Sequence, residues 1–126
     1  FASVDQSDFE KVVACMRDII ERLKDIQNAA SRILKYTSQG RGLFDQDELV
    51  QAWVYQHLKI IGEAAGSIPK KFRINHPEIR WKHIIDMRDA LVYRYFDVNE
   101  DSVWTVVEND ILPLKANIDD ILAEQG

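Results

Sequence analysis

The sequence predicts an all-α protein, a single up-and-down helical bundle with four main helices and a short connector helix. Two observations support this fold class. Apolar residues recur at steps of three and four, the period of an amphipathic helix, and almost no segment alternates with the period of two that a strand requires. The length of 126 residues is that of one domain, so residues 1–126 are expected to form one helical unit.

The first helix is expected over residues 5–36. Ser7 and Asp8 are a candidate N-cap and acidic first turn, and Gly40 and Gly42 follow its C-terminal end. Nine residues form its apolar stripe: Val12, Met16, Ile19, Ile20, Leu23, Ile26, Ala30, Ile33 and Leu34.

The second helix is expected over residues 45–67, and Pro69 ends it. The residues near one face are Leu49, Ala52, Trp53, Gln56, Ile60 and Ala64. Gly62, Ala65 and Gly66 form a surface of small residues. Because glycine inside a helix costs about 1 kcal/mol, this surface indicates close approach of another helix.

Residues 70–80 form a basic connector with a turn at Pro77, and the third helix is expected over residues 81–95. The fourth helix is expected over residues 99–124, with a kink at Pro113, which removes a backbone donor. The apolar stripe of the fourth helix contains Val103, Val106, Val107, Ile111, Leu114, Ile118, Ile121 and Leu122.

Charge separates the chain into a basic island and an acidic remainder. The net charge of −5 argues against attraction of the whole surface to nucleic acid or anionic lipid. Residues 70–94, however, contain seven basic and three acidic residues, a net charge of +4. The island is either a phosphate-binding face or a set of solvated helix charges.

Several classes of protein are excluded. No glycine-rich phosphate loop, zinc-binding histidine pair or long apolar span is present, so we expect no metal, no cofactor and no membrane partner. Residues 1–5 show no secretory signal, and a cytoplasmic location is expected. His57 is interpreted as a packing or surface residue, His76 as a turn cap, and Cys15, the single cysteine, as an inert structural thiol.

The third helix carries the groups with chemical potential. Arg88 and Tyr95 are seven residues apart and share one face of the helix. Asp86, Asp89 and Tyr93 share another face. An arginine near a helix C-terminus is favoured by the helix dipole alone. The same residues also fit a phosphate-binding arginine oriented by Asp89, and spacing does not choose between the two interpretations.

Four blocks follow in order: Ile60-Ile61-Gly62-Glu63-Ala64; His76-Pro77-Glu78-Ile79 with Trp81; Met87-Arg88-Asp89 with Leu91-Val92 and Tyr95-Phe96; and Val103-Trp104. In these blocks, over roughly residues 10–123, the chain resembles the HEPN-domain toxins of the HepT family. The family signature is Arg, a polar residue, three further positions, His, any residue and Tyr. Arg88, Asp89 and Tyr95 match it, whereas position 93 is Tyr in place of His.

The resemblance implies an all-helical homodimer whose motif helices meet across a two-fold axis. It implies a metal-independent endoribonuclease, in which His and Arg support attack of a ribose 2′-hydroxyl on the adjacent phosphate of an mRNA or tRNA. It also implies a toxin encoded beside a minimal nucleotidyltransferase antitoxin, which silences the toxin by transferring AMP to Tyr95. Lys82, His83 and Arg94 are candidate RNA-binding residues on the same helix.

Geometry adds to the expectation of a dimer. Arg88 and Tyr93 lie about 140° apart around an ideal helix, so they need not converge within one chain. A two-fold interface would instead bring each near its mate in the partner.

The tyrosine at position 93 changes the expected activity. A general base works best with a pKa near the operating pH, and a phenol, at about 10, rarely accepts a proton at pH 7, unlike an imidazole. We therefore expect weak or absent ribonuclease activity, through a substitution that permits expression of a toxic protein or through natural degeneration. The alternatives are a non-catalytic dimeric HEPN module that binds nucleotide, RNA or a partner protein, and a structural helical dimer without a ligand.

Overall fold

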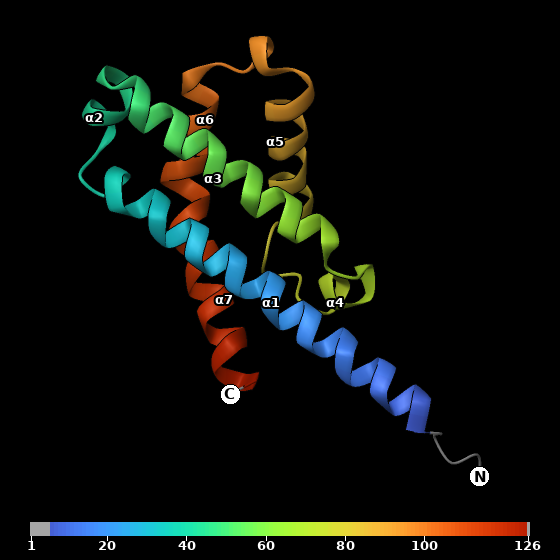
Figure 1. Ribbon diagram of the computed structural model, residues 1–126. Coiled ribbons are helices and arrows are strands. Elements are labelled where there is room, and N and C mark those ends of the chain that lie inside the picture. The colour runs from blue at the N-terminus through green and yellow to red at the C-terminus, as the bar shows by residue number, and fades with distance from the viewer. Residues whose placement is uncertain (1–5, 126) are drawn as a thin grey trace.

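The computed structural model describes residues 6–125 and is all-α, with no strand in that range (Figure 1). The helices in chain order are α1 (Gln6–Thr37), α2 (Arg41–Gln46), α3 (Glu48–Ser67), α4 (Lys70–Asn75), α5 (Trp81–Tyr93), the 3-10 turn η1 (Tyr95–Asp97), α6 (Glu100–Val106), the π-helical turn η2 (Val107–Ile111) and α7 (Leu112–Gln125). Residue 5, the predicted start of the first helix, and residues 1–5, examined above for a secretory signal, lie outside the described range.

The bundle consists of two antiparallel pairs that cross. In Figure 1, α3 runs back along α1, whereas α5 rises and the continuous run from α6 to α7 descends. Helix α3 packs against both α1 and α5, and α7 packs against α1, so both members of the first pair contact the second pair. The predicted four main helices are confirmed. Helices α2 and α4 and the turn η1 are the short connections between them.

The predicted second helix begins later than expected because the chain breaks at Asp47. Gly40, at φ +110°, reverses the chain after α1, and the separate short helix α2 follows. Asp47 is extended, and its carboxylate accepts a hydrogen bond from the backbone N–H of Leu49 at 2.9 Å. This cap starts α3 at Glu48.

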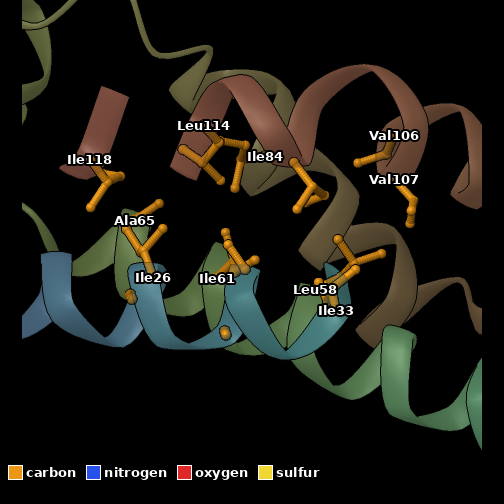
Figure 2. Packing of buried hydrophobic residues seen from close by; sticks show 14 of the residues in the cluster. Ile26, Ile33, Leu58, Ile61, Ala65, Ile84, Val106, Val107, Leu114 and Ile118 are labelled. Carbon is orange, nitrogen blue, oxygen red and sulfur yellow. The ribbon is translucent and has the colours of Figure 1, made fainter. Parts of the chain in front are cut away.

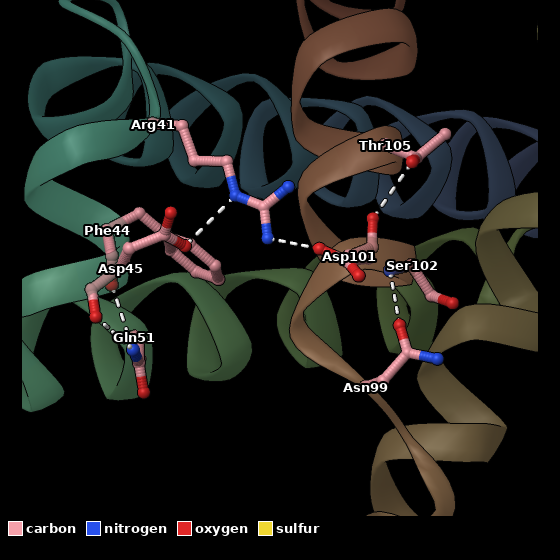
Figure 3. Close-up of polar contacts among 8 residues, drawn as sticks. All are labelled: Arg41, Phe44, Asp45, Gln51, Asn99, Asp101, Ser102 and Thr105. Carbon is pink, nitrogen blue, oxygen red and sulfur yellow. Dashed lines mark hydrogen bonds and ion pairs between the residues drawn. The ribbon is translucent and has the colours of Figure 1, made fainter.

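Three polar contacts position α2 and the start of α6 (Figure 3). The Arg41 guanidinium pairs with Asp45 on its own helix and with Asp101 on α6. Asn99 caps α6 by accepting a hydrogen bond from the backbone N–H of Ser102 at 2.7 Å. These contacts connect the two segments that lead into α3 and α6.

A single hydrophobic core joins the four main helices (Figure 2). The predicted stripes of the first and fourth helices are confirmed in α1 from Leu23 onward and throughout α6, η2 and α7, where Leu122 is partly buried. Figure 2 shows Ile26 and Ile33 of α1 and Ile61 of α3 facing residues of the last helical run.

The predicted buried face of α3 is largely wrong. Leu49, Ala52, Gln56 and Ile60 are exposed, although Ala64 is buried. The buried residues of α3 are Val50, Val54, His57, Leu58, Ile61, Gly62, Ala64 and Ala65. Apolar residues surround much of this helix, so its periodicity permits more than one stripe, and packing between α1 and α5 selects the one that is buried.

Pro113 distorts the fourth helix as expected, but through a wider turn rather than a break. The π-helical turn η2 immediately precedes α7, whose second residue is Pro113. A proline at this position cannot donate to the carbonyl four residues earlier, that of Asn109, and its ring crowds that carbonyl. The π-helical turn accommodates this defect while the helix continues.

Within the described range, no helix is long and apolar enough to cross a membrane. No group of three or more His, Cys, Asp or Glu side chains in that range is arranged to hold a metal ion.

Candidate functional site at the end of helix α5

The local sequence positions both ends of α5. At its start, the Trp81 indole donates to the backbone carbonyl of His76 at 2.9 Å, which anchors the helix to the preceding turn. At its end, Arg94 leaves helical geometry at φ −133° and ψ 40°. The helix therefore ends at Tyr93, two residues before the predicted end.

This early end corrects the predicted placement of Tyr95. Tyr95 lies in η1 and not on the α5 face that carries Arg88, so the seven-residue spacing does not apply to the pair. Its ring contacts the Tyr55 ring of α3 edge to face, with 6.1 Å between centroids. Burial raises the pKa of the Tyr55 hydroxyl, and Glu100 and Tyr95 raise it further, so Tyr55 stays protonated at neutral pH.

Arg88 is packed against α3 at Gly62. A Cβ atom at Gly62 would lie 2.1 Å from the Arg88 Cβ and 2.8 Å from its Cγ, so only glycine permits this approach. The small-residue prediction is therefore confirmed at Gly62. At Gly66, no atom lies within 4 Å of the added Cβ, so the prediction is wrong there.

The Arg88 guanidinium lies among acidic and aromatic groups. Its Nη1 donates to Asp89 at 3.0 Å, and its Nη2 lies 3.6 Å from a carboxylate oxygen of Glu63 on α3. Its Cζ lies 5.8 Å from the centroid of the Tyr93 ring. The hydrogen bond to Asp89 raises the pKa of Arg88, and Tyr93 and Glu63 act in the same direction. The cation is therefore fixed in place and permanently charged.

These contacts correct the expectation that Arg88 and Tyr93 need not converge within one chain. The angular separation is large, but an arginine side chain is long enough to reach across it. Glu63 was missed as a member of this site, although it follows Gly62 directly in the first of the four sequence blocks.

Aromatic side chains cover the exposed end of the site. Tyr93 is 74% exposed and Phe96 is 98% exposed, and Tyr95 between them is also exposed. Val92 adds a further exposed apolar side chain. We call Val92, Tyr93, Tyr95 and Phe96 the motif-end surface. A cluster of exposed apolar and aromatic residues is typical of an interaction surface.

The three candidate RNA-binding residues do not gather around Arg88. The Lys82 ammonium pairs with Asp86 at 2.7 Å, and the His83 Nε2 lies 3.0 Å from a carboxylate oxygen of Asp110. Asp110, on η2, also accepts a hydrogen bond from Arg80 at 2.9 Å. Arg94 is exposed just beyond α5. Much of the predicted basic island is therefore paired within the chain.

The remaining predicted side chains have structural roles or lie on the surface. His57 is buried, with its Nδ1 2.7 Å from the Trp53 carbonyl oxygen, so it is a packing residue as predicted. His76 is the C-cap of α4, and its Nδ1 lies 3.1 Å from Glu78. The interpretation of Cys15 as a structural thiol is wrong, because the side chain is exposed on α1.

Comparison with known proteins agrees with the resemblance to the HepT family. The protein-family model described as "Ribonuclease HepT-like" matches residues 16–121. The chain belongs to this HepT-like family. A HepT-like relative in Thermococcus cleftensis, named "Probable ribonuclease HepT", is 37% identical over 100 residues, which cover 77% of this chain and 89% of the relative.

A second relative, from Methanocaldococcus jannaschii, is named as an RNase and is 32% identical over 120 residues, 90% of this chain and 92% of the relative. A third, from Caldanaerobacter subterraneus, is also named as an RNase and is 35% identical over 82 residues, 65% of this chain and 73% of the relative. No solved structure gives a significant match. Family membership supports a HEPN-type ribonuclease function for the HepT-like chain.

Proposed function

We propose that this chain is the toxin subunit of a HEPN and nucleotidyltransferase pair, a metal-independent endoribonuclease fold that is impaired by Tyr93. The observation that carries the proposal is the Arg88 cation, held by packing on Gly62 and by Asp89 beside the exposed Tyr93. Such a cation recognises a phosphodiester. Two relatives of this chain are named as ribonucleases, which supports RNA as the molecule that carries the phosphodiester.

The proposed reaction is an internal transesterification of RNA. The ribose 2′-oxygen bonds to the adjacent phosphorus, the bond from phosphorus to the 5′-oxygen of the next nucleotide breaks, and a 2′,3′-cyclic phosphate remains. Arg88 stabilises the charge that grows on the phosphate oxygens. Among the described residues, no group accepts a hydrogen bond from its buried Nε, so Arg88 has a donor not used within the chain.

Tyr93 occupies the position from which a base would accept the 2′-hydroxyl proton. Its phenol can donate a hydrogen bond to a phosphate but is a poor proton acceptor at neutral pH. The proposal is therefore that this chain binds RNA more readily than it cleaves it. The alternative function, a non-catalytic module that binds RNA, nucleotide or a partner protein, follows from the same observation.

The test is RNA cleavage in EDTA by this chain and by Tyr93→His. We expect the histidine variant to cut about 10²–10⁴-fold faster and to leave cyclic phosphate ends. Arg88→Ala in the Tyr93→His background should abolish cutting, whereas Arg17→Ala, an exposed arginine on α1, should not. Absence of cutting by Tyr93→His on any RNA contradicts the ribonuclease proposal, and RNA binding by the same protein then favours the alternative.

Neutralisation by AMP transfer is part of the proposal. The Tyr95 hydroxyl would attack the α-phosphate of ATP on the antitoxin, and pyrophosphate would leave. Tyr95 is exposed in the turn that follows the motif helix, which supports access by a second protein. The added phosphate and nucleoside would place negative charge and bulk on the motif-end surface.

Tyr95→Phe should therefore abolish AMP incorporation by the cognate antitoxin, as measured by intact mass. Tyr93→Phe is the matched control, because Tyr93 is also exposed but is not the proposed acceptor. Labelling that survives in Tyr95→Phe and disappears in Tyr93→Phe would move the acceptor to Tyr93.

A further inference from the structure

The first part of α1 extends beyond the rest of the bundle (Figure 1). Between residues 6 and 18 every residue is exposed except Val13, which is partly buried. Phe9, Val12 and Met16 are 58%, 57% and 50% exposed. A helical segment without tertiary contacts has little stability of its own in water, so a partner for the apolar face of this segment would stabilise it.

The exposed apolar residues of α1 belong to a stripe that continues into the core. Phe9, Val12, Met16 and Ile19 follow one another at steps of three and four residues. The same steps lead on to Leu23, Ile26, Ala30 and Ile33, all completely buried. This is the pattern of a helix that packs along another helix over its whole length. The part of the chain that the structure describes covers only the second half of the stripe.

We propose that the exposed half of α1 pairs with the same segment of a second copy, antiparallel across a two-fold axis. The exposed residues Phe9, Val12 and Met16, together with Ile19, which is partly buried against the core, determine the register. Phe9 lies opposite Ile19 of the second copy, and Val12 lies opposite Met16. A longer overlap would require Leu23 and Ile26, which the core already uses. The antiparallel direction also places the two bundles at opposite ends of the contact.

Charges at the edges of the stripe agree with this direction. Asp8, Cys15 and Arg22 are spaced by seven residues along one edge. In the antiparallel register, Asp8 faces Arg22 of the second copy, and the symmetry repeats this pair. Arg22 also pairs with Asp25 at 3.0 Å and lies 3.9 Å from Asp18 on its own helix, and its side chain is 36% exposed, which leaves access for a further carboxylate. Val13 and Ile20 on the other edge widen the apolar seam. In a parallel pair, Asp8 would face Val13 of the second copy, so the ion pairs between Asp8 and Arg22 would not form.

The register places Cys15 beside Cys15 of the second copy, close to the two-fold axis. Because Cys15 is the only cysteine in the chain, a short bis-maleimide reports this contact directly. We expect a covalent dimer on a denaturing gel. The matched control is Ala14→Cys in a Cys15→Ala background, which moves the thiol to the outward face of the same helix turn. It should cross-link at least about ten-fold less. Equal cross-linking of the two proteins overturns the proposal.

A double variant, Val12→Asp with Met16→Asp, tests the apolar contact between the two copies of α1. Both positions are exposed, so the fold should persist, as checked by circular dichroism. Cross-linking at Cys15 should disappear, and the native mass by light scattering should fall. Unchanged cross-linking would contradict the proposal. Phe96→Ser alters the motif-end surface and should leave Cys15 cross-linking unchanged. Loss of cross-linking in Phe96→Ser would assign the contact to that other surface.

Discussion

At the scale of single residues, the site depends on the absence of a side chain at Gly62. Because Gly62 has no side chain, α3 approaches α5 closely and Arg88 packs along the surface of α3. The backbone carbonyl oxygen of Ile84 on α5 lies 3.1 Å from the position that a Cβ atom at Gly62 would take. Packing limits where the guanidinium can move, so Asp89 and Glu63 need only orient it. Close packing and charge therefore act together on Arg88.

Gly62→Ala should destabilise the protein and Gly66→Ala should not. The first Cβ overlaps Arg88, and relieving such overlap costs about 1–3 kcal/mol. The second meets no atom within 4 Å, so the better helix propensity of alanine should stabilise the fold by about 0.5–1 kcal/mol. Urea denaturation of both variants measures the difference. Equal free energies of unfolding would contradict the close contact in solution.

At the scale of elements, one polar contact fastens the last helix to the first. The Gln27 amide of α1 donates to Asp119 of α7 at 2.7 Å, and the Lys115 ammonium donates to the other oxygen of Asp119 at 2.8 Å. The hydrogen bond from Gln27, followed by that from Lys115, lowers the pKa of Asp119. Apolar side chains of α1 and α7 also belong to the shared core.

The contribution of Asp119 to stability should depend on pH. A lowered pKa in the folded state means that the contribution is complete above the unfolded pKa, about 4, and is lost as the pH falls through the folded value. Asp119→Asn should therefore be less stable than the parent at pH 7, by about 0.5–1 kcal/mol, and the difference should shrink below about pH 4. Urea denaturation between pH 7 and pH 3 tests this. A difference that stays constant with pH would refute it.

At the scale of the whole molecule, two of the exposed apolar surfaces within residues 6–125 are candidates for contact with a second copy. One is the motif-end surface, where the resemblance implies a two-fold contact between motif helices. The other is the exposed half of α1. If both proposed contacts form about different two-fold axes, they build an assembly larger than a dimer.

Phe96→Ser should remove one of these contacts. Phe96 is 98% exposed, so the free energy of unfolding should change by less than about 0.5 kcal/mol. The native mass by light scattering at micromolar concentration should nevertheless fall. Leu112→Ser, at an exposed position on α7, is the matched control and should keep the parent mass. A parent protein that is itself monomeric at that concentration rules out the dimer.

The sequence by itself determined the four main helical segments, the buried stripe of the first helix from Leu23 onward, the buried stripe of the last helical run, and the motif that contains Arg88 and Asp89. These features depend on local spacing and on turn-forming residues such as Gly40 and Pro69, which act regardless of the rest of the fold. Tertiary structure decided which face of α3 is buried, because that helix has apolar residues on several sides and only its packing partners choose among them.

Tertiary structure also decided the composition of the site. It ended α5 at Tyr93 and directed Tyr95 toward Tyr55, so a spacing argument that assumed a continuous helix misplaced Tyr95. It brought Glu63 to Arg88 and Asp110 to His83 across gaps in the sequence that no local pattern spans. Contacts between helices depend on the close approach of whole elements, and a period of three to four residues carries no information about that approach.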